Sequence, residues 1–162
     1  MRTRADYHDA HSPQGARFVD LLDEVMRLNG RMLAAMRRST RVTGLSPAES
    51  ILLSTVVCSP SPPTVPRVGR ALGQTRQGVQ RTADRLVELG LIEWLPNPDH
   101  ARAHCMGPTA EGRELYDRDN AESAQWADRT VAGMDPAALD LTLETLRELR
   151  RRLEEAERDA GP

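Results

Sequence analysis

Residues 74–90, QTRQGVQRTADRLVELG, predict a single amphipathic helix. Its apolar side chains recur at helical spacing and form a narrow stripe made of Val79, Ala83, Leu86 and Val87. Thr75 can cap the free backbone amides at the start of this helix. Gly90 can end it, because a helix often stops at a residue with positive φ.

The opposite face of this helix is rich in arginine and glutamine. Its polar side chains are Arg76, Gln77, Gln80, Arg81 and Arg85. Such side chains form forked hydrogen bonds with base edges or pair with phosphates. They crowd the N-terminal half, which a DNA-binding helix places against the bases. An ordinary surface helix with a solvated arginine face has the same pattern, so the neighbouring segments have to distinguish the two.

A helix with a strong start signal is predicted from Ser46 to Cys58. Ser46 is the cap, Pro47 suits the first helical position, and Glu49 can reach back to complete a capping box. The segment is apolar on several sides, so we expect this helix to be buried in the core.

A short helix is predicted between this core helix and residue 74. The proline-rich loop 59–63 excludes helix and central strand. Thr64 then caps a helix over residues 65–72, and Gly73 ends it. A short helix, a tight turn with glycine and a longer helix with a basic N-terminal face form the pattern of a helix-turn-helix.

A β-hairpin is predicted directly after the helix-turn-helix, where the hydrophobic period changes from helical to two. Residues 91–95 and 103–106 predict two short strands joined by a turn, and Gly107-Pro108 is expected to end the second. A helix-turn-helix followed by such a hairpin is a winged helix. Its wing is the hairpin tip, residues 97–102, from which Arg102 can reach a minor groove or a phosphate.

Both ends of the chain predict helices outside the winged helix. One spans Gln14–Arg38, after a polar tail, residues 1–13, that we interpret as flexible rather than metal-binding. Thr109 caps another that continues towards Val131, and Asp135-Pro136 starts the last one.

The last helix has a leucine stripe at spacings of three and four, made of Leu139, Leu143, Leu146, Leu149 and Leu153. The stripe either packs on the first helix of the same chain or forms a dimer interface together with the other terminal helices. We favour the dimer, because terminal helices beside a compact winged helix have little core of their own to cover. The opposite face is rich in arginine and glutamate.

Composition limits the function classes. The 162 residues include 22 arginines and no lysine, and the net charge is −2, so any DNA affinity has to come from a local positive patch. Aromatic residues make up only 3%, which argues against single-strand binding by base stacking. No apolar run is long enough to span a membrane and the start lacks a secretion signal, so we expect a cytoplasmic protein without a membrane partner.

No motif indicates an enzyme, a cofactor or a metal site, because a phosphate loop, a nucleophile elbow and paired metal motifs are all missing. Cys58 and Cys105 are too few for a disulfide framework or a zinc site, and we expect both to be inert rather than redox-active. His100 and His104 fall on the hairpin without a nearby acid pair, so we interpret them as DNA-proximal or solvated.

These motifs, in this order, resemble the MarR family of transcriptional regulators. The matching stretches are Leu45–Glu49, Val68–Val79, Asp84–Ile92 and Thr109–Gly112. Together they are specific, although each is weak alone. The terminal helices match only in type and position.

The resemblance implies a mainly α fold with a small β-hairpin wing, in a single domain spanning residues 1–162. Terminal helices in 14–44 and 110–160 are expected to dimerise, and the winged-helix lobe, 45–109, to bind double-stranded DNA at an inverted repeat. Many family members are repressors released by small phenolic or other lipophilic molecules, so such an effector is an expected partner.

The sequence departs from the family pattern at two places. The wing has His100-Ala101-Arg102 where the family usually has Asp-Arg-Arg, so it should bind DNA more weakly or be held differently. Gly78 replaces a helix former, and it either permits close approach to a phosphate or loosens the first turn.

We therefore predict a set of DNA-contacting residues. Base-edge contacts are assigned to Arg76, Gln77, Gln80 and Arg81, and phosphate or minor-groove contacts to Thr64, Thr75, Arg85 and Arg102, with Gly78 and His100 next to the DNA. The alternative is a winged helix used as a protein-interaction module, which the reduced wing and the net acidity also fit. Salt-sensitive binding to duplex DNA distinguishes the two.

Overall fold

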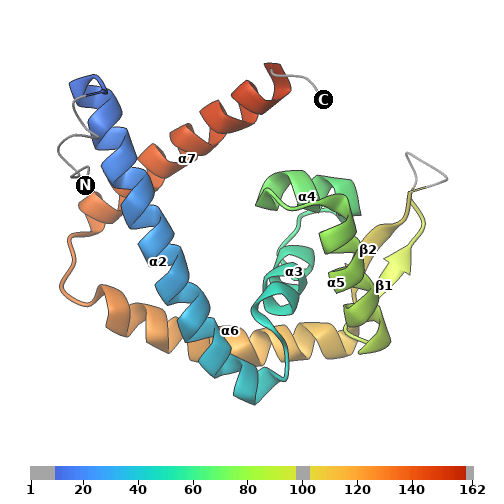
Figure 1. Cartoon of the computed structure of the whole chain (residues 1–162). Helices are drawn as coiled ribbons and strands as arrows, with labels where there is room; N and C mark the ends of the chain where they lie inside the picture. The colour runs from blue at the N-terminus through green and yellow to red at the C-terminus, as the bar shows by residue number, and fades with distance from the viewer. Residues whose placement is uncertain (1–9, 98–102, 160–162) are drawn as a thin grey trace, which may run out of the picture. The chain divides into compact units, whose positions relative to one another are not determined.

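The computed structural model describes residues 10–97 and 103–159. These residues form six helices and one antiparallel hairpin (Figure 1). In chain order they are α2 Pro13–Thr43, α3 Pro47–Val57, α4 Val65–Leu72, α5 Arg76–Glu88, β1 Ile92–Leu95, β2 Cys105–Pro108, α6 Ala110–Val131 and α7 Pro136–Asp159. The predicted fold class is confirmed. The chain divides into two units, Met1–Asp119 and Asn120–Pro162.

Helix α2 is longer than the pattern predicted. It begins one residue early, because Ser12 acts as a cap and its Oγ accepts a hydrogen bond from the Gly15 amide at 3.1 Å. It also continues past Arg38 to Thr43. Neither glycine nor proline interrupts this extension until Gly44, whose φ of 73° ends the helix.

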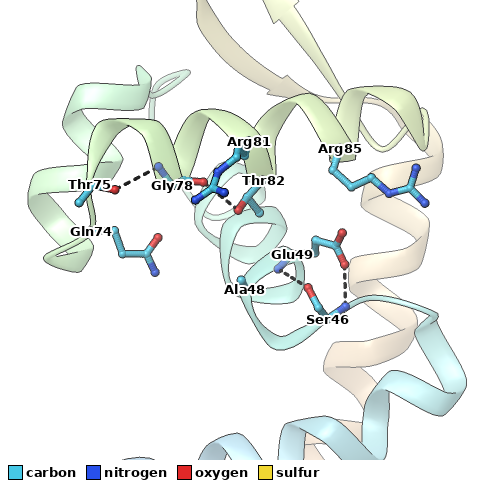
Figure 2. Close-up of a pocket in the computed structure, with 9 residues that line it drawn as sticks. All are labelled: Ser46, Ala48, Glu49, Gln74, Thr75, Gly78, Arg81, Thr82 and Arg85. Carbon is cyan, nitrogen blue, oxygen red and sulfur yellow. Dashed lines mark hydrogen bonds between the residues drawn. The ribbon is translucent and has the colours of Figure 1, made fainter.

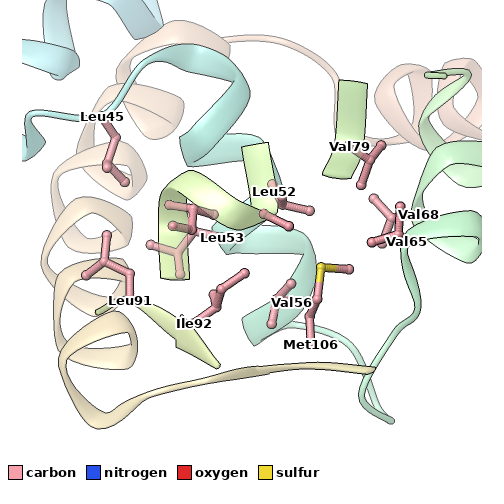
Figure 3. Close-up of a cluster of buried hydrophobic side chains, with 12 residues drawn as sticks. Leu45, Leu52, Leu53, Val56, Val65, Val68, Val79, Leu91, Ile92 and Met106 are labelled. Atoms are coloured by element: carbon pink, nitrogen blue, oxygen red, sulfur yellow. The ribbon is translucent and has the colours of Figure 1, made fainter. Parts of the chain in front are cut away.

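Helix α3 lies in the core and begins with the predicted capping box. The Glu49 amide donates to Ser46 Oγ at 3.4 Å, and the Ser46 amide donates to Glu49 Oε2 at 2.7 Å. The buried side chains of α3 meet those of α4, α5 and the hairpin in one cluster (Figure 3). Its members are Leu45, Leu52, Leu53, Val56, Val65, Val68, Val79, Ala83, Leu86, Leu91, Ile92 and Met106. This cluster fixes α5 on the rest of the first unit.

The second strand differs from the prediction, which ended it at Gly107-Pro108. Both residues belong to β2 and pair with Glu93 and Ile92. Pro108 is tolerated in β2 because successive backbone nitrogens point to opposite sides of a strand, and the nitrogen of Pro108 is on the side that does not bond to β1. The Met106 amide donates to the Pro63 carbonyl at 2.8 Å, on the side away from β1, and the nitrogen of Pro108 faces the same side.

Helix α6 is anchored to the end of α5 through Thr109. The Thr109 hydroxyl donates to the Gly90 carbonyl at 2.6 Å, and its oxygen accepts from the Gly112 amide at 3.0 Å. The Thr109 amide donates to the Leu91 carbonyl at 3.1 Å. The predicted cap therefore also ties the start of α6 to the turn between α5 and β1.

The second unit contains the C-terminal part of α6 and the whole of α7. The predicted cap of α7 is present, since Asp135 Oδ1 accepts a hydrogen bond from the Ala137 amide at 3.0 Å. Leu143 and Leu153 of the leucine stripe are 45% and 53% exposed. The charged face of α7 holds an ion-pair cluster in which Arg151 bridges Glu148 and Glu155 at 2.8 and 2.6 Å.

Candidate nucleic-acid interface

The turn between α4 and α5 brings the two helices close together. Gly73 adopts a left-handed conformation with φ of 61°, and the Gln74 amide donates to the Gly69 carbonyl at 2.8 Å. A Cβ added to Gly69 would lie 2.9 Å from the Gln74 carbonyl oxygen, closer than a real side chain permits. The two glycines therefore set how α5 leaves α4, which is the geometry of a helix-turn-helix.

The N-terminus of α5 is capped as predicted. Thr75 Oγ1 accepts a hydrogen bond from the Gly78 amide at 3.1 Å. The amides of Arg76 and Gln77 precede the helical hydrogen bonds, so they remain free to donate at this end of the helix. A Cβ at Gly78 would lie 3.1 Å from Thr75 Oγ1, so a larger residue here would require a small shift of the Thr75 side chain.

The outer face of α5 carries three polar side chains that have no partner in the described part of the chain. Val79, Ala83 and Leu86 are buried as the stripe predicted, and Val87 packs against them half-buried. Arg76, Gln77 and Arg81 are exposed and have no hydrogen-bond or ion-pair partner within residues 10–97 and 103–159. Their donors are therefore available to an external ligand.

Two other predicted contact residues of α5 have partners on the same helix. Arg85 Nη1 pairs with Glu88 Oε2 at 3.1 Å. Gln80 Nε2 donates to Asp84 Oδ1 at 2.9 Å. The sequence reasoning did not assign a role to Asp84, although its spacing of four residues from Gln80 is the spacing at which helical side chains meet.

A groove of about 500 Å³ runs between the start of α3 and α5 (Figure 2). Its lining residues are Ser46, Ala48, Glu49, Gln74, Thr75, Gly78, Arg81, Thr82 and Arg85. The predicted residues Thr75, Gly78, Arg81 and Arg85 thus share one surface. The α3 side of this surface was not predicted as part of the site, because its residues carry a capping signal that explains them without a ligand.

Thr64 lies apart from this groove, at the junction of α4 and the hairpin. Its Oγ1 accepts from the Arg67 amide at 3.4 Å, which confirms the predicted cap. Its backbone forms a bridge with Cys105 of β2. The side chain is half-buried, so its outer part alone is available for a contact.

The base of the wing carries an aromatic pair. The rings of Trp94 and His104 meet edge to face with centroids 6.4 Å apart. They line a hollow of about 490 Å³ together with Pro96, Asn97 and Ala103. The predicted contact residues His100 and Arg102 lie outside the described residues.

Both cysteines are unbridged thiols. Cys105 is buried in β2. Cys58 is exposed at the end of α3, and its Sγ lies within hydrogen-bond distance of Tyr116 Oη, at 3.0 Å. The Cys58 sulfur, as a partner of the phenol O–H, and then burial raise the pKa of the Tyr116 hydroxyl.

Residues 10–97 and 103–159 contain neither a grouped metal-ligand set nor a helix suited to spanning a membrane. Within those ranges no three His, Cys, Asp or Glu side chains are grouped to share a metal ion. None of the helices described there combines the length and the apolar character that crossing a membrane requires.

This chain is similar in sequence to one set of known proteins and in structure to another. The chain is 37% identical over 134 residues to an uncharacterized protein of Mycobacterium tuberculosis, covering 78% of this chain and 92% of that protein. The structure of CouR from Rhodococcus jostii RHA1 bound to p-coumaroyl-CoA is similar, with a TM-score of 0.73 and 22% identity over 81% of this chain and 92% of that one. A MarR/EmrR family transcriptional regulator from Acinetobacter sp. ADP1 has a TM-score of 0.75 and 20% identity, covering 84% and 96%.

The family model that matches the sequence is that of the MarR family, and it covers residues 43–103. This segment contains the capped α3, the helix-turn-helix of α4 and α5, and the strand β1. The solved structures, at 20% and 22% identity, show the same fold over most of both chains. The chain therefore belongs to the MarR family of transcriptional regulators.

Proposed function

We propose that two copies of this chain bind an inverted repeat in double-stranded DNA, with α5 of each copy in a major groove. The observation that carries this proposal is the outer face of α5, where Arg76, Gln77 and Arg81 have no partner in the described part of the chain. A two-fold pair would place the two α5 helices about 34 Å apart, one turn of DNA.

The remaining contacts are proposed to hold the duplex. Thr75, before the first residue of α5, and Arg85, in its last turn, both line the groove between α3 and α5, where a phosphate can approach. Thr64 is assigned to the backbone at the start of α4. Arg102 and His100 are assigned to the wing, which would touch the minor groove. The terminal helices would hold the two copies together.

The dimer is proposed to act as a repressor that a small phenolic or lipophilic molecule releases. This part rests on the family resemblance, and the p-coumaroyl-CoA bound to CouR is an example of such a ligand in a protein of this fold. Titrating phenolic acids and their coenzyme A thioesters into the protein–DNA complex tests it. Release by one of them supports the proposal, and retention of the complex with all of them contradicts it.

Selection of bound sequences from a random duplex pool tests DNA binding directly. We expect an inverted repeat, and binding that weakens steeply with salt. With the selected operator, Arg76→Ala or Arg81→Ala should each weaken binding by roughly 1–3 kcal/mol. Arg118→Ala is the matched control, because it removes the same charge from an exposed position of α6.

Two results would contradict this assignment. Unchanged operator affinity in both α5 variants would mean that the outer face of α5 does not contact bases. Absence of any salt-sensitive duplex binding would instead favour the protein-interaction module, to which the net charge of −2 also points.

A further inference from the structure

The hydrogen bond between Gln80 and Asp84 restricts what α5 can present to DNA. Gln80 Nε2 donates to Asp84 Oδ1 at 2.9 Å, and Gln80 is half-buried against the helix. Among the four side chains proposed to contact bases, Gln80 alone has such a partner in the described residues. Arg76, Gln80 and Asp84 follow one another at spacings of four along one edge of α5, so they form a continuous row.

Asp84 forms no ion pair in the part of the chain that the structure describes. The other acidic residue of α5, Glu88, pairs with Arg85 at 3.1 Å. Within residues 10–97 and 103–159, no cation forms an ion pair with the carboxylate of Asp84, and its hydrogen-bond partner is the Gln80 amide. A carboxylate on a DNA-facing helix repels phosphates, so it needs a compensating role.

That role follows from the chemistry of the two groups. An ionised carboxylate accepts hydrogen bonds and cannot donate them, so it holds the NH₂ group of Gln80 and excludes the flipped amide, whose oxygen would face it. Gln80 then presents its oxygen and one remaining N–H in a fixed order. One acceptor beside one donor is complementary to the N6 amino group and N7 of adenine in the major groove.

We infer that Asp84 is a positioning residue, which orients the Gln80 amide so that α5 selects an A·T pair at one position of each half-site. This inference rests on the proposed DNA binding. It assigns base discrimination to a side chain that need not touch the DNA.

Sequence selection with the full-length chain and its variants tests the inference. Asp84→Ala and Gln80→Ala should both lose the A·T preference at the same position, where the wild type discriminates by roughly tenfold or more. Asp84→Glu keeps an acceptor-only group and should retain the preference. Glu88→Ala is the matched control, because it removes a carboxylate from the same helix without touching Gln80.

The outcomes separate this inference from the proposed function. A wild-type protein that selects no duplex motif overturns both. A wild-type inverted repeat that is unchanged in Asp84→Ala, or that changes at a different position from Gln80→Ala, overturns the positioning role alone. Equal loss in Glu88→Ala also overturns it, because the effect would then be general to the charge of α5.

Discussion

At the scale of single residues, Gly69 and Gly112 fix the position of α5 because neither has a side chain. A side chain at Gly69 would meet the Gln74 carbonyl, and a side chain at Gly112 would overlap the Leu91 carbonyl oxygen. Each glycine therefore permits a helix to approach a backbone more closely than any other residue allows. Gly69 sets the turn before α5 and Gly112 sets the contact after it, so the positions of both ends of α5 depend on these two glycines.

Gly112→Ala is expected to destabilise the fold by about 3 kcal/mol, because the added methyl group forces α6 away from Leu91. Urea unfolding measures the change. Gly30→Ala is the control, since a Cβ there meets nothing within 4 Å. It should stabilise α2 by about 1 kcal/mol through helix propensity. A Gly112→Ala protein as stable as the wild type would contradict the close contact between Gly112 and the Leu91 carbonyl.

At the scale of elements, α7 is stabilised by ion pairs between its own side chains. Arg151 bridges Glu148 and Glu155, and Arg152 Nε also pairs with Glu148 at 2.6 Å. Hydrogen bonds from Arg151 and Arg152 lower the pKa of Glu148 from 4.5 to about 2. All of these groups are solvent-exposed, so salt screens the cluster. The charged side chains of this cluster occupy one face of α7, and the leucine stripe lies on a different face.

The lowered pKa of Glu148 predicts a pH dependence. Because the folded pKa lies below the ordinary value, the ion pairs favour the helix above about pH 4.5 and are lost as the pH falls towards 2. An NMR titration of the Glu148 carboxyl carbon measures this directly. Arg151→Ala should move the pKa of Glu148 upwards, whereas Arg158→Ala should not, because Arg158 contacts the Glu154 carbonyl instead. Titration of wild-type Glu148 near 4.5 would contradict the cluster.

The helix starts could be predicted from the sequence, whereas the end of β2 could not. Caps were predictable, because Ser46, Thr64 and Thr75 each combine a short polar side chain with a following apolar period. The end of β2 was not, because the rule that glycine and proline break strands ignores which side an amide faces. The pairing of Asp84 with Gln80 was not predicted, because a pattern of residue types indicates which side chains can face DNA but not which neighbours on the helix bond to each other.

At the scale of the whole molecule, the exposed leucines of α7 and the single-sided α5 both fit a two-fold assembly. One α5 helix can contact only one half-site, and an inverted repeat needs a second copy. Leu143 and Leu153 are about half exposed in the single chain, which is unusual for a stripe of that regularity unless another surface covers it. We therefore propose that the stripe is part of the dimer interface.

Replacing Leu143 and Leu153 together by glutamate should convert a dimer into a monomer, because the interface would then bury unpaired charges. Sedimentation equilibrium of the full-length chain measures the mass. Leu141→Glu is the matched control, since Leu141 is 65% exposed on the same helix but lies off the stripe. A monomeric wild type, or a double variant that stays dimeric, would contradict the assigned interface.

The bridge between Thr64 and Cys105 has a consequence for protein engineering. Thr64 starts α4, and Cys105 and Met106 belong to the strand that leads out of the wing, so the hairpin and the first helix of the helix-turn-helix share a seam. A chimera that takes a foreign wing should exchange only the segment between Asn97 and Ala103. A crossover inside β2 would replace residues that contact the segment before α4. We expect the foreign strand to shift the start of α4, although the exchange was intended to change the wing alone.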